Sequence, residues 1–211
     1  MKRNILLIVI LLCVDQALKL YIKTHFMLGE QTAVLGNWFY LHFTENNGMA
    51  FGMELEGTGG KLLLSTFRIL AILGLGYYLF KLVQKKASRL HQTSVALVFA
   101  GALGNILDST FYGWMFTDSY GKVAQLFPEQ GYAPMLFGKV VDMLYFPMWQ
   151  GVFPTWLPIW GGEPFEFFRP VFNIADTCIS TGVGLMVVFQ NRFFGETKIT
   201  NPSSEQINKI Q

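Results

Sequence analysis

Charged residues are scarce in this sequence: Asp, Glu, Lys and Arg together make up 14% of its 211 residues, against about 25% in an ordinary soluble domain. Apolar residues make up 52% of the chain, and the mean hydropathy is +0.36. This composition argues against a typical soluble domain and indicates a membrane protein. The formal net charge of +2 excludes a strongly basic nucleic-acid-binding protein.

Cysteine and histidine are also rare. The two cysteines, Cys13 and Cys178, lie inside apolar runs, where a free cysteine packs as a small hydrophobic side chain, so we predict neither a disulfide nor a redox role. The three histidines, His25, His42 and His91, are scattered and have no second ligand at the spacing of a metal site. We therefore expect no structural or catalytic metal and no cofactor.

Four long apolar stretches are present, at about 4–21, 62–83, 94–116 and 170–194. Each is close to the roughly 20 residues that a transmembrane helix needs, and each contains polar interruptions. We predict an all-α membrane protein with four transmembrane helices, organised as a single polytopic domain over residues 1–211.

The first stretch has a second interpretation, a cleaved secretory signal peptide, because Lys2 and Arg3 precede a short apolar run that ends at Val14. No cleavage site of the A-x-A type follows, and "ILLC" lacks the small residues that would precede a lipidated cysteine. The helical pattern also continues through "DQALKLYI". We therefore expect the segment to be retained as a span.

Basic residues concentrate on one side of the four spans. They are Lys2, Arg3, Lys81, Lys85, Lys86, Arg89, Arg192 and Lys198. Positive charge marks cytoplasmic loops, so both termini are expected in the cytoplasm, with a polar tail at about 195–211. The remaining segments, at about 23–61 and 113–169, then face outward.

The two outer segments are rich in aromatic residues. All five tryptophans lie in them or at the outer ends of spans, as expected for an interfacial belt. The stretch "GNWFYLHFTENNGMAFG" alternates partly and predicts one or two short strands, a small extracytoplasmic β element. The later stretch "LYFPMWQGVFPTWLPIWGGEPFEFF" is dense in Pro, Trp and Phe, which disfavours a long helix and favours an interfacial segment at headgroup level.

Polar side chains within the spans gather at one depth, near the outer ends. They are Asp15 and Lys19 in the first span, Arg68 in the second, Asn105 and Asp108 in the third, and Asn173 and Asp176 in the fourth. Such residues are costly in a bilayer, and they usually pair with one another or carry function. Asp15 with Lys19, and Asp108 with Arg68 or Lys19, would be structural ion pairs. Asp176 has no basic residue within a helical turn, so we favour a functional role for it.

A second candidate carboxylate stands in "GKVVDMLYF", where Asp142 follows a short apolar run. A lone loop Asp is commonly a turn residue, and sequence spacing alone does not bring Asp142 to Asp176. If the two meet in a partly dehydrated site, they share a proton. One carboxylate can then activate water while the other protonates the carbonyl or the leaving amine, which is peptide hydrolysis without a metal or a covalent intermediate.

Five blocks, in order along the chain, carry a family resemblance: "DQALK", "NNGMAFG", "GALGNILDS", "VVDM" and "FNIADTCI". Together they resemble the bacterial lipoprotein signal peptidases, or signal peptidase II, a family of four-span aspartyl proteases in the inner membrane. The resemblance implies removal of signal peptides from diacylglyceryl-modified prolipoproteins, by a cut just before the lipidated cysteine. It also implies an active site near the outer leaflet.

The resemblance implies that Asp142 and Asp176 are the catalytic pair. It implies further that eight residues bind substrate or support the site: Asp15, Lys19, Asn46, Gly48, Asn105, Asp108, Asn173 and Ala175. The partners implied are diacylglyceryl-modified prolipoproteins and membrane lipids, with no nucleic acid and with a monomeric protein. Gly48 and Gly52 would permit close backbone approach in the outer loop, and Asn46 could hydrogen-bond the substrate backbone.

Two positions depart from the family pattern. Leu18 stands where Ser or Thr is usual, and Ser109 stands where the family typically has Arg. A guanidinium there would order neighbouring carbonyls or carboxylates through several donors. Either Arg68 or Lys139 substitutes for it, or the site is organised differently.

Length is a third departure, because the stretches 113–138 and 144–168 are longer than is typical and would suit an enlarged lid or substrate platform. Two other classes of protein stay open. In a small transporter, buried Asp, Asn and Lys residues would line a path, but here they cluster at one depth and the outer loops are larger than a carrier needs. An inactive binding relative would keep the fold without the reaction.

Overall fold

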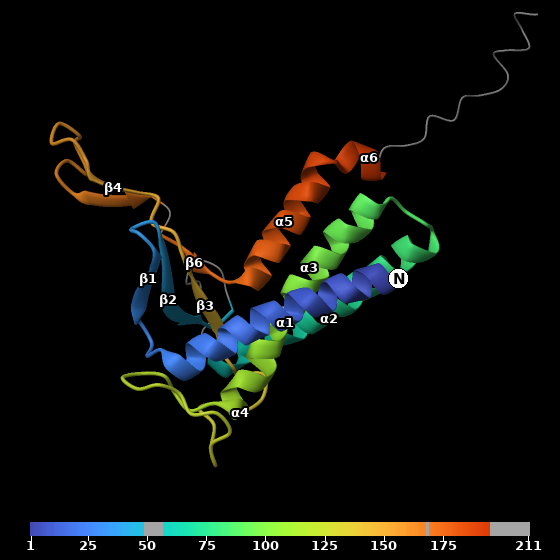
Figure 1. The fold of residues 1–211 in the computed structure, drawn as a ribbon, viewed down its shortest axis with the longest axis horizontal. Coiled ribbons are helices and arrows are strands. Elements are labelled where there is room, and N and C mark those ends of the chain that lie inside the picture. Colours follow the sequence, from blue (N-terminus) through green and yellow to red (C-terminus); the bar gives the residue numbers. More distant parts are fainter. Residues whose placement is uncertain (49–56, 168, 195–211) are drawn as a thin grey trace, which may run out of the picture.

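Four helices form the body of the computed structural model, which describes residues 1–48, 57–167 and 169–194 (Figure 1). They are α1 (Lys2–His25), α2 (Gly57–Gln84), α3 (Arg89–Leu107) and α5 (Ile174–Val188), and the short α6 (Gln190–Phe194) follows the last of them. A small sheet lies at the end of the bundle opposite the N-terminus (Figure 1).

Three helices are long and apolar enough to cross a membrane: Lys2–His25, Leu63–Gln84 and Arg89–Met115. The first three predicted spans fall on them, so the chain is a helical, multi-pass membrane protein. The fourth apolar helix, α5, has 15 residues, or roughly 22 Å, against a hydrocarbon core of about 30 Å. The fourth span therefore stays a prediction.

Helix α5 begins at Ile174, later than the predicted start of the span at 170. The residues Val171–Phe172 form strand β6, and Asn173 then caps the helix. Hydropathy does not distinguish an apolar strand from the first turn of an apolar helix, which is why the predicted boundary was wrong.

Glycines let α3 and α5 approach closely. A Cβ atom on Gly101 of α3 would collide with the backbone carbonyl of Ala175, and one on Gly182 of α5 would collide with that of Ser94. Small residues at such contacts are a common means of packing helices within membranes. This contact fixes the start of α5 against α3.

The third helix ends in a wider turn. After α3, the chain forms the π-helical segment η2 (Asp108–Tyr112) and the three-residue helix α4 (Gly113–Met115). The returning chain satisfies the backbone of this turn, since the N–H of Gly138 donates to the Ser109 carbonyl at 2.8 Å. Single π turns inside α-helices are frequent at functional sites, and here the turn buries the side chains of Asp108 and Ser109.

The four strands of the sheet have the order β1-β2-β3-β6, with β1 at Gln31–Leu35, β2 at Phe39–Asn46, β3 at Val140–Tyr145 and β6 at Val171–Phe172. All neighbouring strands are antiparallel. β1 and β2 fall in the outer segment that was predicted to hold short strands. β3 comes from the second outer segment and β6 from the start of the predicted fourth span, and no strand was predicted in either place. The sheet therefore joins the two outer segments to the residues that lead into α5.

A separate hairpin projects away from the bundle (Figure 1), formed by β4 (Trp149–Val152) and β5 (Pro164–Phe167). It occupies the stretch in which a long helix was disfavoured. Its exposed large side chains are Trp149, Val152, Trp156, Ile159, Trp160 and Phe167. An apolar surface of this kind on a projecting hairpin is typical of a contact with lipid or a partner.

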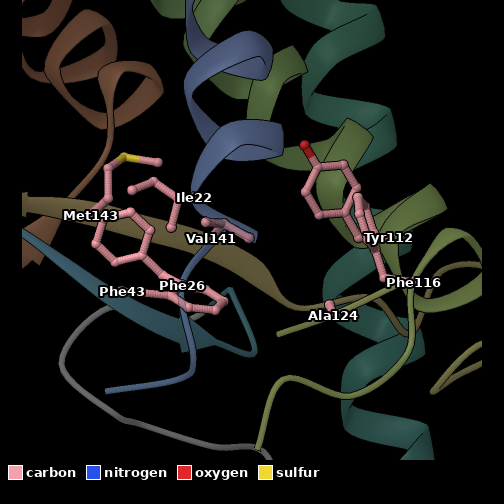
Figure 2. Close-up of a cluster of buried hydrophobic side chains, with 8 residues drawn as sticks. All are labelled: Ile22, Phe26, Phe43, Tyr112, Phe116, Ala124, Val141 and Met143. Atoms are coloured by element: carbon pink, nitrogen blue, oxygen red, sulfur yellow. The ribbon is translucent and has the colours of Figure 1, made fainter. Parts of the chain in front are cut away.

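Buried apolar side chains join the sheet to the bundle (Figure 2). The cluster comprises Ile22, Phe26, Phe43, Tyr112, Phe116, Ala124, Val141 and Met143. Its members come from α1 and the residue that follows it, Phe26, and from β2, β3, η2 and the chain that follows α4. Burying one such aromatic or aliphatic side chain contributes about 1.5–3 kcal/mol. Leu18, at a position where the family usually has Ser or Thr, packs against this cluster.

Lys23 was predicted to open the first outer segment, but it lies in the last turn of α1 and is fully buried. It forms an ion pair with Glu45, and its ammonium group donates to Ser119 Oγ at 2.9 Å. The rings of Phe43, Phe116 and Tyr132 surround the ammonium group at 5.0–5.7 Å. These contacts offset the desolvation of the charge, so the helix continues past the predicted end of the span.

Candidate active site

Two carboxylates reach one site from different elements. Asp142 lies on β3 and is 5% exposed, and Asp176 lies in the first turn of α5 and is half-buried. Asn173 contacts both: its side-chain amide donates to Asp142 Oδ1 at 2.7 Å, and its backbone N–H donates to Asp176 Oδ2 at 3.4 Å. Strand β6 brings Asp142 and Asp176 together, because it runs beside β3 and leads into α5. Sequence spacing alone does not predict this approach.

The start of α5 explains how a carboxylate is held at the end of an apolar helix. The N–H of Asp176 donates to Asn173 Oδ1 at 2.8 Å, and the Asp176 side chain accepts the N–H of Asn173, which is a capping box. The helix dipole also favours negative charge in this first turn. A further donor, Asn105 Nδ2, reaches Asp176 Oδ1 at 2.8 Å. These donors offset part of the desolvation cost of Asp176.

Asp142 accepts amide hydrogen bonds on both carboxylate oxygens, from Asn173 on Oδ1 and from Asn46 on Oδ2. Burial, followed by the charge of Asp176, raises the pKa of Asp142 to about 7. The hydrogen bond from Asn46 and the charge of Lys19 act in the opposite direction. Near neutral pH, the protonated and ionised forms of Asp142 are therefore both populated.

Lys19 ties the carboxylate pair to the bundle. Its ammonium group is fully buried, 2.9 Å from Asp15 Oδ2 and 2.8 Å from Asp108 Oδ2. It also donates to Asn105 Oδ1 at 3.0 Å. Because the Asn105 oxygen faces Lys19, the Asn105 amide N–H₂ is directed at Asp176. Of the ion pairs considered from the sequence, Asp15 with Lys19 and Asp108 with Lys19 are present.

Asp15 and Asp108 also hold the backbone next to each carboxylate of the pair. Asp15 Oδ1 accepts the N–H of Ala175 at 2.9 Å, and Asp108 Oδ2 accepts the N–H of Val141 at 3.3 Å. Ala175 immediately precedes Asp176 in the chain, and Val141 immediately precedes Asp142. The two buried acids therefore fix the peptide units from which the pair projects.

The first outer loop contributes Asn46 and Gly48. Gly48 has a φ of 86°, in the left-handed region that favours glycine, and its N–H donates to Asn46 Oδ1. A Cβ atom on Gly48 would collide with the guanidinium of Arg68. Gly52, for which a similar role was predicted, lies outside the described residues.

All ten residues named from the sequence lie in this one network or directly against it. Sequence reasoning missed Gln16, whose Nε2 donates to Asp108 Oδ1 at 2.8 Å and whose Oε1 accepts from the Tyr112 hydroxyl at 3.1 Å. The available signal was a neutral polar residue beside Asp15 inside an apolar span.

Arg68 of α2 occupies the space beside Ser109. Arg68 Nη1 lies 3.5 Å from Ser109 Oγ, and Arg68 Nη2 donates to the Gly48 carbonyl. Lys139 is the other residue considered for this position, and its Nζ lies 3.6 Å from Glu45 Oε2. Of the two candidates, Arg68 is the one that contacts Ser109.

The sequence was compared with known proteins. The pattern of the family described as "Signal peptidase (SPase) II" matches residues 7–192. A lipoprotein signal peptidase of Porphyromonas gingivalis is 54% identical over 184 residues, which are 86% of this chain and 80% of that protein. A lipoprotein signal peptidase of Amoebophilus asiaticus is 38% identical over 181 residues, which are 83% of this chain and 72% of that protein.

Two solved structures, each described as a bacterial membrane enzyme obtained by the in meso method, have similar folds. Their TM-scores are 0.60 and 0.58, at sequence identities of 24% and 25%. Each comparison covers 95% of this chain and 96% of the other. The arrangement of helices and sheet is thus shared with membrane enzymes of known structure.

Proposed function

The chain belongs to the signal peptidase II family and removes signal peptides from prolipoproteins, and we propose that Asp142 and Asp176 hydrolyse the scissile bond as an aspartyl protease does. The observation that carries this proposal is the meeting of two carboxylates from β3 and α5 on Asn173. Burial and the neighbouring charge raise the pKa of Asp142 to about 7, which suits a group that gives and takes a proton at neutral pH.

The proposed reaction starts with the proton on Asp142 and with Asp176 ionised. Asp176 takes a proton from a water molecule, and the water oxygen attacks the scissile carbonyl carbon. Asp142 gives its proton to the carbonyl oxygen, which forms a neutral tetrahedral diol. When the diol collapses, Asp176 passes its proton to the leaving nitrogen and Asp142 recovers a proton from a hydroxyl group of the diol. No covalent intermediate forms, and each carboxylate ends in its starting state.

In the proposal, the other polar residues position the two carboxylates or bind the substrate. Lys19, Asp15, Asp108 and Asn105 hold the carboxylates in place through the contacts described above. Asn46 and Gly48 stand at the edge of the site on the first outer loop, where they would bind the substrate backbone. Asn173 sets the separation of the pair because its backbone N–H and its amide serve different carboxylates.

We propose that the protein has four spans, with both termini in the cytoplasm of a bacterium and the site near the outer leaflet of the inner membrane. The N-terminus lies at the end of the bundle away from the sheet (Figure 1), and the basic residues near it support this orientation. Arg3 Nη2 donates to the Arg89 carbonyl at 3.2 Å, so these two cations lie at the same end. Positive charge favours the cytoplasmic side. Helix α5, followed by α6, would complete the fourth crossing.

The substrate in this proposal is a prolipoprotein that already carries a diacylglyceryl group on the cysteine after the cut. A lipid-tethered peptide bond lies near the bilayer surface, which is the depth that we assign to Asp142 and Asp176. All five tryptophans are exposed, among them Trp149, Trp156 and Trp160 of the hairpin. Indole rings favour the headgroup region, so we propose that the hairpin contacts lipid beside the site of a monomeric enzyme.

Cleavage of a diacylglyceryl-modified prolipoprotein by the purified protein in detergent, with chelator present, tests the proposal. Asp142→Asn and Asp176→Asn should each lower the cleavage rate by about 10²- to 10⁴-fold and retain substrate binding. Asp118→Asn is the matched control, because Asp118 is an exposed carboxylate of the outer segment and its change should leave the rate unaltered. Retention of more than a tenth of the rate by either variant would exclude that carboxylate from the chemistry.

A further inference from the structure

Arg68 of α2 reaches the end of the bundle at which Asp142 and Asp176 meet, and the reaction proposed above gives it no role. Arg68 is half-buried, and its guanidinium makes two polar contacts with residues that the structure describes. Nη2 donates to the carbonyl of Gly48, and Nη1 lies 3.5 Å from Ser109 Oγ. Arg68 therefore connects three elements: α2, the first outer loop and η2.

The contact with Gly48 continues into the carboxylate pair. The N–H of Gly48 donates to Asn46 Oδ1, and Asn46 Nδ2 donates to Asp142 Oδ2. Arg68 thus stands at the far end of a chain of hydrogen bonds that runs through Gly48 and Asn46 to Asp142. A change in the position of Gly48 would alter which way the Asn46 amide points.

The charge of Arg68 also acts on the pair directly, through its attraction to Asp176. Other charges lie nearby: Asp142 on β3, Lys19 and Asp15 on α1, and Asp108 on η2. Lys19 is held between Asp15 and Asp108 at 2.9 and 2.8 Å. The guanidinium of Arg68 thus adds one positive charge to a group of buried and half-buried acids around Lys19.

Helix α2 is fixed at this height by a second contact one turn earlier. Ser65 is buried, and its Oγ donates to the carbonyl of Leu136 at 3.2 Å. Residues three apart share one face of a helix, so Ser65 and Arg68 are directed toward the same neighbours. Arg68 thus extends from an anchored backbone, which limits the positions that its guanidinium can take.

We propose that Arg68 is a positioning residue for signal-peptide cleavage, which holds the Asn46–Gly48 turn against Asp142. The inference rests on the proposed function. An arginine suits this position because its planar group carries several separate donors, which can serve Gly48 and Ser109 together, whereas a lysine offers a single ammonium group.

Four variants test the proposal, with cleavage of the same lipidated prolipoprotein as the measurement. Arg68→Ser should lower kcat/KM by about 10- to 100-fold, as expected for the loss of a hydrogen bond to a charged group. Arg68→Lys should keep part of the activity, because the charge remains while the second contact is lost. Lys81→Met is the matched control, since it removes a cation from the other end of α2 and should leave kcat/KM unchanged.

The fourth variant separates positioning from a general effect on folding. Ser109 faces Arg68, so an arginine introduced at 109 starts within reach of the same space. The double variant Arg68→Ser with Ser109→Arg should be about tenfold more active than Arg68→Ser alone.

Each outcome decides the matter. Rescue by the double variant, at an unfolding temperature equal to that of Arg68→Ser, supports the proposal. Unchanged cleavage by Arg68→Ser, beside inactive Asp142→Asn and Asp176→Asn, overturns it and leaves the proposed function standing. A loss of activity in Arg68→Ser that neither Arg68→Lys nor the double variant relieves also overturns it. No cleavage by the unmutated protein would instead refute the proposed function.

Discussion

Lys19→Met should destabilise the protein severely, because Lys19 balances two buried acids. Its ammonium group lies between Asp15, which is 3% exposed, and Asp108, which is fully buried. Removing one partner of a buried ion pair leaves an uncompensated charge and costs about 3–5 kcal/mol. Asp15 and Asp108 keep the hydrogen bonds from Ala175 and Val141, so we expect the lower end of this range. Even that is a large share of a typical stability of about 5–15 kcal/mol.

The assay is the unfolding temperature of the purified protein in detergent at pH 7. Lys19→Met should lower it strongly, because Asp15 and Asp108 lose the buried cation that lies between them. Adding Asp108→Asn to Lys19→Met removes one of the orphaned charges and should recover part of the loss, so the two changes should not be additive. Simple additivity of the two losses would refute the reasoning that Lys19 acts by balancing charge.

Three further predictions follow from particular contacts. The kcat/KM of cleavage should fall as the pH rises above about 7, because the pKa of Asp142 lies there and the reaction needs its proton. Asn46→Ala removes a hydrogen bond that lowers the pKa of Asp142, so this variant should move the fall to higher pH in the measured profile. Gly101→Ala should lower the unfolding temperature and the cleavage rate together, since the new Cβ atom would collide with the Ala175 carbonyl. Overpacking of this kind costs about 1–3 kcal/mol. Unaltered cleavage would show that the start of α5 tolerates displacement. Lys23→Met should cost stability near the lower end of about 3–5 kcal/mol, because Glu45 would keep only its longer ion pair with Lys139, at 3.6 Å, yet the fraction that stays folded should cleave at the normal rate, which single-turnover kinetics can measure.

Local patterns in the sequence were sufficient to predict three of the helices, whereas the candidate site residues came from the family resemblance. Apolar runs locate three helices of span length, because hydropathy depends on the residues of one segment alone. The family resemblance carried by the five sequence blocks implied that Asp142, Asp176 and eight further residues belong together. The structure brings all ten into one network at the end of the bundle next to the sheet.

What the sequence could not supply depends on contacts between distant segments. The pairing of β3 with β2 and β6 aligns Asp142 with Thr44 and brings the strand that carries it beside the start of α5, and no local pattern specifies such a partner. The same holds for Lys23, which is buried because Glu45 and three aromatic rings from other elements surround it. In the sequence, Arg68 is an isolated charge within an apolar span. Only the fold brings Gly48 and Ser109 into contact with it.

The double variant Asp142→Asn with Asp176→Asn tests the central claim most directly, when its single-turnover cleavage of a diacylglyceryl-modified prolipoprotein is compared with that of each single variant. Groups that act as one catalytic unit are strongly non-additive. The account predicts that the double variant is no slower than the slower single variant, because either change already disables the shared-proton pair. A loss in the double variant equal to the product of the two single losses would contradict it, since the two carboxylates would then contribute independently.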